Sequence, residues 1–231
     1  MLDIETKPAT AYVWGFWDQR VGAEQVIAPG GTICVGAKFV GDKQSFLFSE
    51  WEHGHQGMLE GIHALMDQAD ALITYNGDKF DLPILNGEFA LAGMTPPAPA
   101  TSIDVFKSVR RLKLGIHKLG YVGPRFGLGN KLTHEGFGLW KGVMNGDPKS
   151  QKKMARYCVQ DVKLLEKLYL RVLPYITNHP HLVGQPAHTC PACSSTKLHS
   201  RGWRRTRTMQ VQRLQCQDCG SWHYGSRKKV T

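Results

Sequence analysis

The stretch "MLDIET" (residues 1–6) places two carboxylates two positions apart in a segment that otherwise predicts a β-strand. Because residues i and i+2 of a strand point to the same side, Asp3 and Glu5 present their oxygens together. Unpaired, the two charges would repel each other, and partial burial would increase that cost. A hard divalent cation such as Mg²⁺ or Mn²⁺ prefers carboxylate oxygens and removes the cost. The stretch therefore suggests a cation site. For a D-x-E pair taken alone, however, a solvent-exposed edge strand is the stronger interpretation.

A second acidic position follows the apolar segment 71–76, in "YNGDKFDLPIL" (residues 75–85). Pro83 lies where the first turn of a helix favours proline, so we expect a helix to start near Asp81. A loop at this place lifts a side chain to the edge of a sheet, and a helix N-terminus tolerates an anion. Asp81 is therefore a second candidate metal ligand, although taken alone it fits a helix N-cap better.

The third stretch, "YCVQD" (residues 157–161), lies within the clearest helical pattern of the chain, residues 148–173. Tyr157 and Asp161 are four residues apart and share one face of that helix. Tyr157 can position a water while Asp161 holds a metal. In isolation, an ordinary Tyr/Asp pair on a helix surface is the better interpretation.

The order of the predicted elements indicates an α/β protein. Strands are expected first, at residues 1–6, 11–17, 32–40 and 45–49. Helical segments, including 57–69 and 148–173, then alternate with short apolar strands at 71–76 and 101–106. This order predicts a mixed β-sheet with an antiparallel side, flanked by helices.

Taken together, the three stretches make residues 1–176 resemble the DEDD (DnaQ-like) exonuclease superfamily, which has an RNase H-like fold. The likeness is greatest to the proofreading domains of family B DNA polymerases and to stand-alone phage-type exonucleases. Tyr157 marks the DEDDy subgroup, because the position where the other subgroup needs histidine is Arg156. Family members have several apolar residues before the D-x-E pair, whereas only Met1 and Leu2 precede it here, so a truncated first strand is expected.

The resemblance implies a metal-dependent 3′–5′ exonuclease that releases nucleoside 5′-monophosphates from single-stranded or frayed DNA 3′ ends. It implies two Mg²⁺ or Mn²⁺ ions, about 3.5–4 Å apart, bound by four acids: Asp3, Glu5, Asp81 and Asp161. Tyr157 would orient the attacking water and Asn76 would contact the substrate. Phe80 is expected either against the terminal nucleotide or in the core.

After Pro174 the composition changes, and residues 177–188 read as a linker to a small module at 189–231. Two C-x-x-C pairs (Cys190, Cys193, Cys216 and Cys219) predict a zinc ribbon that holds one structural Zn²⁺. From Ala187 to the end there are nine Lys or Arg residues and one acid. Arginines interleaved with an aromatic residue suit phosphates and unpaired bases, which predicts nucleic-acid binding by Arg201, Trp203, Arg204, Arg205, Arg207 and Arg213. The alternative is that Trp203 and Trp222 form the core of the ribbon.

The whole chain carries a net charge of +10, which favours a polyanionic partner. There is no apolar run of 18 or more residues and no secretory signal pattern, so no membrane contact and a cytoplasmic location in a bacterial or phage-infected cell are expected. The loop "GLGNKL" (residues 127–132) has too few glycines for a dinucleotide-binding loop. Two alternatives stay open: a protein that binds nucleic-acid ends without cutting them, and an exonuclease acting on RNA. A replication or repair polymerase is a candidate partner.

Overall fold

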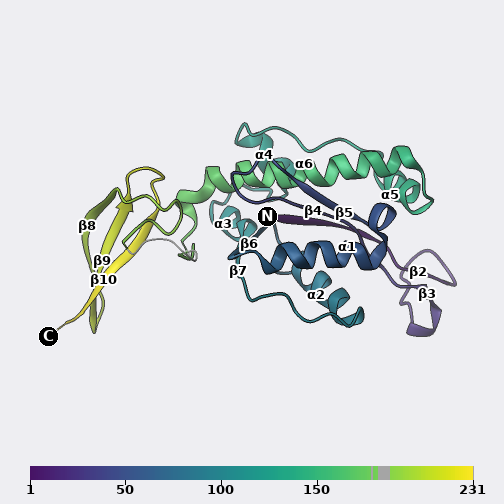
Figure 1. The fold of residues 1–231 in the computed structure, drawn as a ribbon, viewed down its shortest axis with the longest axis horizontal. Coiled ribbons are helices and arrows are strands. Elements are labelled where there is room, and N and C mark those ends of the chain that lie inside the picture. The colour runs from purple at the N-terminus through teal and green to yellow at the C-terminus, as the bar shows by residue number, and fades with distance from the viewer. Residues whose placement is uncertain (178, 182–187, 231) are drawn as a thin grey trace.

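The computed structural model describes residues 1–177, 179–181 and 188–230. Two arrangements of strands form the body of the molecule (Figure 1). The first is an antiparallel sheet of three strands in the order β1–β4–β5, namely Leu2–Lys7, Gly31–Ala37 and Phe46–Ser49. The second is a parallel pair, β6 (Ala71–Thr74) and β7 (Thr101–Asp104), which lies beside β1. This is the mixed α/β fold that the sequence predicts.

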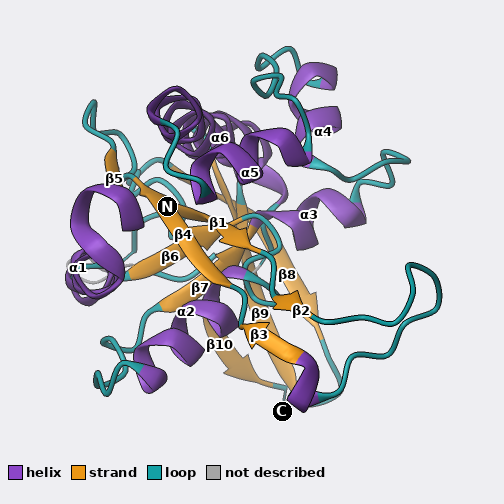
Figure 2. Cartoon of the chain, turned by 90° about the vertical axis from the view of Figure 1, so that its right-hand side faces the viewer, coloured by secondary structure: helices purple, strands orange, loops and turns teal. Residues whose placement is uncertain are grey.

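Helices cover both faces of the strands, as Figure 2 shows. Helices α1 (Glu50–Asp67) and α2 (Asp81–Leu91) lie on one face. The other face is covered by helices that come later in the chain. These are α3 (Val105–Arg111), α4 (Leu119–Arg125), α5 (Phe137–Met144) and α6 (Pro148–Val172).

Strand β1 contributes alternate residues to the two faces. Leu2 and Ile4 are buried in the apolar cluster formed with α1 and α2. Asp3 and Glu5 point the opposite way, toward the side where Cys158 of α6 donates its thiol to the Asp3 carbonyl at 3.6 Å. Because α6 covers that side, Asp3 and Glu5 are only partly accessible, which contradicts the exposed-edge interpretation.

Helix α6 is long because its start and its buried face are both well specified. The Asp147 carboxylate caps the helix by accepting the backbone N–H of Ser150 at 2.9 Å, and Pro148 occupies the first turn. Residues at helical spacing then pack under the sheet and against α3 and α4, among them Met154, Val162 and Leu165. This packing fixes the position of every residue that α6 presents to β1.

The strand expected at residues 11–17 is wrong. Strand β2 spans only Thr10–Ala11 and pairs for two residues with β3 (Val26–Ala28), after which the chain runs out as a loop that projects from the body (Figure 2). In that loop Trp14, Phe16 and Trp17 are 98%, 93% and 85% exposed. The aromatic and β-branched composition favours a strand, but residues 12–17 lie beyond the short pairing with β3.

The C-terminal module is an antiparallel sheet in the order β10–β9–β8, at Trp222–Lys229, Met209–Cys216 and Leu198–Arg205. It lies beyond the end of α6 (Figure 1), where the Ser221 hydroxyl donates to the Leu173 carbonyl at 3.4 Å. Of the predicted linker 177–188, residues 178 and 182–187 lie outside the described part, so its boundaries stay a prediction. Among the described residues, no helix is both long enough and apolar enough to cross a membrane.

Candidate active site and zinc-type cysteine cluster

Three of the four predicted acids come together between β1 and α6. Asp3 and Glu5 of β1 and Asp161 of α6 each offer a carboxylate oxygen, and these oxygens all lie within 4.8 Å of one another. Asp161 is 1% exposed, and Tyr157 is also buried. Burial contradicts the interpretation of Tyr157 and Asp161 as a pair on the helix surface.

The fourth acid, Asp81, lies next to this cluster but outside the 4.8 Å group. It is the first residue of α2, and its carboxylate accepts the backbone N–H of Ile4 at 3.0 Å. Ile4 separates Asp3 from Glu5 along β1, so Asp81 is held beside both of them. The N-cap position belongs to Phe80, which means that Asp81 is not the helix cap.

Each acid of the site has a raised pKa. Burial is the main cause for Asp3, and the charges of Asp81, Asp161 and Glu5 raise its pKa further. Burial and then Asp161 raise the pKa of Glu5 to about 7. Burial raises the pKa of Asp81 to about 6. Burial also raises the pKa of Asp161, although the neighbouring Lys131 opposes the shift. The site therefore concentrates negative charge that an added cation would stabilise.

Lys131 is a residue of this site that the sequence analysis missed. It lies in the loop between α4 and α5, and its ammonium group is 2.5 Å from Asp161 Oδ2. It also donates to the Tyr157 hydroxyl at 3.2 Å. Burial alone would lower the pKa of Lys131, but Asp161 raises it instead, so this side chain is a permanent cation inside the acid cluster. A single lysine in a glycine-rich loop carries no spacing signal, and the sequence offered nothing that would have found it.

Tyr157 is held by aromatic neighbours. The rings of His134 and Trp140 lie with centroids 5.0 Å and 6.3 Å from its own. Trp140 in turn donates its indole N–H to the Thr6 carbonyl of β1 at 3.1 Å. Burial raises the pKa of Tyr157 to about 12, so the phenol stays protonated at neutral pH and keeps a proton to donate.

A cavity of about 920 Å³ opens beside the acids. Asp3, Asn76 and Lys131 line it together with the aromatic residues Tyr75, Phe106 and Tyr121. Asn76 thus faces the space next to the acids, where the sequence analysis expects a substrate contact. Phe80 is 44% exposed, which contradicts the alternative that it packs in the core.

The donor set fits divalent cations. Oxygens from three carboxylates converge, and these are the ligands that Mg²⁺ and Mn²⁺ prefer. Asp161 Oδ1 is buried and has no hydrogen-bond partner in the part of the chain that the structure describes. A buried carboxylate oxygen without a donor is destabilising unless a cation completes it.

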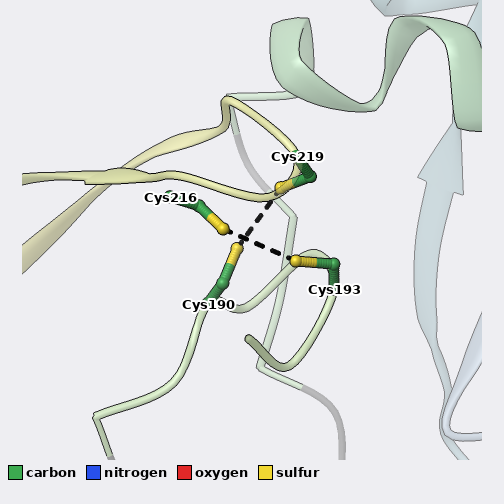
Figure 3. A group of neighbouring side chains, drawn as sticks. All are labelled: Cys190, Cys193, Cys216 and Cys219. Carbon is green, nitrogen blue, oxygen red and sulfur yellow. Dashed lines mark hydrogen bonds between the residues drawn. The ribbon is translucent and has the colours of Figure 1, made fainter. Parts of the chain in front are cut away.

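The four cysteines of the ribbon converge as Figure 3 shows. Their sulfurs lie within 4.8 Å of one another, with Cys190–Cys219 and Cys193–Cys216 separations of 3.6 Å. A disulfide needs about 2.05 Å, whereas a tetrahedral zinc with Zn–S bonds of about 2.3 Å sets the sulfurs about 3.8 Å apart. The cluster therefore fits a structural zinc ion, as the sequence predicts.

The basic residues of the ribbon are exposed on and around its sheet. Arg201, Arg204 and Arg205 lie on β8, Arg213 lies on β9, and Arg207 lies in the turn between these strands. Trp203 is 40% and Trp222 is 48% exposed, which contradicts the alternative that they form the ribbon core. Lys228 lies over the ring of Trp203 at 5.2 Å from its centroid. The face therefore combines cations with an accessible aromatic ring.

Comparison with known proteins places the larger part of the chain. No curated protein matches it. Among solved structures it is similar to the family B DNA polymerase from the hyperthermophilic archaeon Pyrobaculum calidifontis, with a TM-score of 0.53 and 17% sequence identity. That match covers 63% of this chain but only 22% of the polymerase, and at this identity it shows the fold alone. Residues 1–173 match the sequence profile of the RNase H superfamily, and the chain therefore belongs to that superfamily.

Proposed function

We propose that this protein is a metal-dependent 3′–5′ exonuclease of the DEDDy type that acts on single-stranded or frayed DNA 3′ ends. Membership in the RNase H superfamily supports a nuclease. The observation that carries the finer proposal is the convergence of Asp3, Glu5 and Asp161, with Asp81 beside them and Tyr157 one helical turn from Asp161.

The residues of the chain have distinct roles in this proposal. Asp3, Glu5, Asp81 and Asp161 would hold two Mg²⁺ or Mn²⁺ ions, which when bound supply Lewis acidity for attack on the terminal phosphodiester and for departure of the 3′ oxygen. Tyr157, protonated and fixed by its aromatic neighbours, orients the attacking water. Lys131, which lies beside Asp161, would add a positive charge near the place where the phosphate reacts.

The cavity beside the acids supports a nucleotide substrate. Asn76 supplies a polar contact there, and Tyr75, Phe106 and Tyr121 supply ring surfaces of the kind that bind unpaired bases. The arginines and Trp203 of the ribbon would bind the strand away from the reaction centre. The structural neighbour is a DNA polymerase, which supports DNA as the substrate and a replication or repair polymerase as a partner.

The test is a gel assay with a 5′-labelled single-stranded DNA oligonucleotide and Mg²⁺ or Mn²⁺. The wild-type protein should produce a ladder that shortens from the 3′ end, and Asp161→Asn should lose this activity. Asp42→Asn is a matched control, because Asp42 is an exposed acid outside the site. Equal activity of wild type and Asp161→Asn would refute the proposal. An RNA oligonucleotide of the same sequence tests the substrate class. An intact oligonucleotide that the protein still binds would favour a non-cleaving end-binding protein.

A further inference from the structure

A second cavity, of about 390 Å³, shares the wall of the candidate active site. It lies between loop residues 132–134 and the N-terminal half of α6. Tyr157 forms part of its lining, and Lys131, which contacts both Tyr157 and Asp161, is the residue that precedes the lining loop. The cavity is therefore adjacent to the acid cluster, with Tyr157 between them.

The lining of this cavity is cationic. Four basic side chains of α6 line it, and no acid does: Lys149, Lys152, Lys153 and Arg156. Lys153 pairs with Glu135 of the loop. The other three make no ion pair within residues 1–177, 179–181 and 188–230. The nearby Asp147 carboxylate is engaged in capping α6 through Ser150.

Such a lining attracts an anion. Lys152 and Arg156 are exposed and four residues apart, and like charges at this spacing destabilise a helix. The same spacing separates Lys149 from Lys153, whose charge Glu135 partly offsets. A phosphate removes that repulsion, because a guanidinium binds it through two hydrogen bonds and ammonium groups add point charges. At about 390 Å³ the cavity is at the small end of the range of ligand pockets, which suits a phosphate and its sugar rather than a duplex.

We propose that this cavity binds backbone phosphates of the nucleic-acid strand, next to the phosphate that is hydrolysed. The inference rests on the proposed nuclease function and adds a subsite to it. The acid cluster repels phosphates unless metal is bound, so a strand needs a nearby positive surface that holds it at the reaction centre. Lys149, Lys152 and Arg156 provide that surface on the same helix that carries Tyr157 and Asp161.

The test compares Lys152→Gln/Arg156→Gln with the full-length wild-type protein. Both residues are exposed, so the fold is expected to persist, which a thermal unfolding curve checks. Binding of a fluorescent single-stranded oligonucleotide is measured by anisotropy across a range of salt concentrations, in buffer freed of Mg²⁺ and Mn²⁺ but without a chelator that would remove the ribbon zinc. The variant should bind about tenfold more weakly, and its salt slope should fall by about 1.4, since each phosphate contact to a single strand contributes about 0.7.

Two controls make the result decisive. Lys163→Gln/Lys167→Gln removes two exposed charges of the same helix that do not line the cavity and should change binding by less than half as much. With Mg²⁺, the variant should show a raised KM on the oligonucleotide and an unchanged kcat on the nitrophenyl ester of thymidine 5′-monophosphate, which has one phosphodiester.

Four outcomes would overturn the inference. The first is that the variant binds the oligonucleotide as tightly as the wild type, and the second is that Lys163→Gln/Lys167→Gln loses as much affinity as the variant. The third is that kcat on the small ester falls in parallel with oligonucleotide binding. The fourth is that the variant differs from the wild type only in its inhibition by free thymidine 5′-monophosphate. The last would make the cavity a product site. If the wild type cleaves neither substrate, the nuclease proposal fails, and the anisotropy difference alone still decides whether the cavity binds a strand.

Discussion

Lys131 occupies the place in the acid cluster where a metal ion would also be stabilised. Its ammonium group, 2.5 Å from Asp161 Oδ2, offsets part of the charge that Asp3, Glu5 and Asp161 concentrate between β1 and α6. The same contact makes Lys131 a competitor for a bound cation. Its removal should therefore weaken the metal-free protein and strengthen its response to metal.

We expect Lys131→Gln to lower the Tm of the metal-free protein at pH 8 by roughly 5 °C, because the Asp161 carboxylate loses its charged partner. Saturating Mn²⁺ should then raise Tm by more in the variant than in the wild type. Lys153→Gln is the matched control, since Lys153 of α6 pairs with the exposed Glu135 of the loop, outside the acid cluster. A Mn²⁺ response in Lys131→Gln no larger than in the wild type would contradict competition.

The raised pKa of Glu5, about 7, predicts an unusual pH dependence of the metal-free protein. The folded state binds this proton more tightly than the unfolded state, so Glu5 stabilises the fold at low pH. That contribution is lost as the pH rises from about 4.5 to 7. The Tm in EDTA should accordingly fall from pH 5 to pH 8, and Mg²⁺ should raise Tm more at pH 8 than at pH 5.

Glu5→Gln provides the comparison for this titration. The variant cannot ionise at that position, so its Tm in EDTA should vary less with pH than that of the wild type. A wild-type Tm that rises steadily between pH 5 and pH 8 in EDTA, with no difference from Glu5→Gln, would show that Glu5 is ionised in the folded protein at ordinary pH.

The acids of the site were predictable because each lies in an element that the sequence specifies. Leu2 and Ile4 alternate with Asp3 and Glu5, Pro83 marks a helix start after Asp81, and the apolar stripe of α6 fixes the face of Asp161. Lys131 and His134 were not predictable as site residues. They lie in a loop whose path depends on tertiary contacts, and no local periodicity specifies those contacts.

At the scale of elements, the site depends on how closely α6 approaches the sheet. Gly36 of β4 pairs with Asp3 of β1. A Cβ atom at Gly36 would lie 3.0 Å from Cys158 Sγ and 3.1 Å from Val162 Cγ2. A side chain at this position would press on α6, so glycine favours the close contact between strand and helix. The approach sets the distance across which Asp161 meets the carboxylates of β1.

Gly36→Ala should therefore push α6 away from the sheet. We expect a loss of about 1–3 kcal/mol from overpacking, which lowers Tm by roughly 5 °C, together with lower nuclease activity. Gly87→Ala on α2 is the matched control, because a Cβ there would have no atom within 4 Å. That change should raise stability by about 0.5–1 kcal/mol, since alanine is the better helix former. Thermal unfolding and the gel assay measure both variants, and unchanged stability in Gly36→Ala would argue against the tight contact.

The loop at residues 12–17 shows where prediction at the element scale fails. Its aromatic residues have the propensity of a strand, but propensity describes fit to a half-buried pleated surface rather than a backbone preference. The strand expected at residues 32–40 does form, as β4, because β1 and β5 flank it and it is buried over most of its length. Residues 12–17 are rich in strand-forming aromatic residues but have no such neighbours.

At the scale of the molecule, the ribbon is a small module of its own, in which positive charge is concentrated. The described part of this module has few buried apolar residues, and Cys190 and Cys216 are among them. A module with so small a core depends on its metal for folding. We expect one zinc per chain by elemental analysis, and Cys216→Ser should abolish it. Loss of zinc should unfold the ribbon while the buried clusters around α6 keep the rest folded. Loss of the folded α/β body, seen as loss of its helical signal or of its unfolding transition in Cys216→Ser, would contradict this independence.

The proposed role of the ribbon is to hold the strand by electrostatic contacts while the acid cluster carries out hydrolysis. Arg205 and Arg207 are exposed, and their side chains make no ion pair or hydrogen bond within the described part of the chain, so these side chains are free to bind phosphates. Arg205→Gln/Arg207→Gln should lower the salt slope of binding to single-stranded DNA by about 1.4. The kcat on the small nitrophenyl ester should stay unchanged, because the ribbon lies beyond the end of α6 (Figure 1).

Combining these two substitutions with Lys152→Gln/Arg156→Gln separates the two basic surfaces. If one strand spans both, the reductions in salt slope should add in the fourfold variant, because each removed cation releases its own share of counterions. Oligonucleotides too short to reach the ribbon should respond only to the α6 substitutions. A fourfold variant no weaker than either double variant would mean that the ribbon and the cavity do not bind the same strand. The ribbon would then serve another partner.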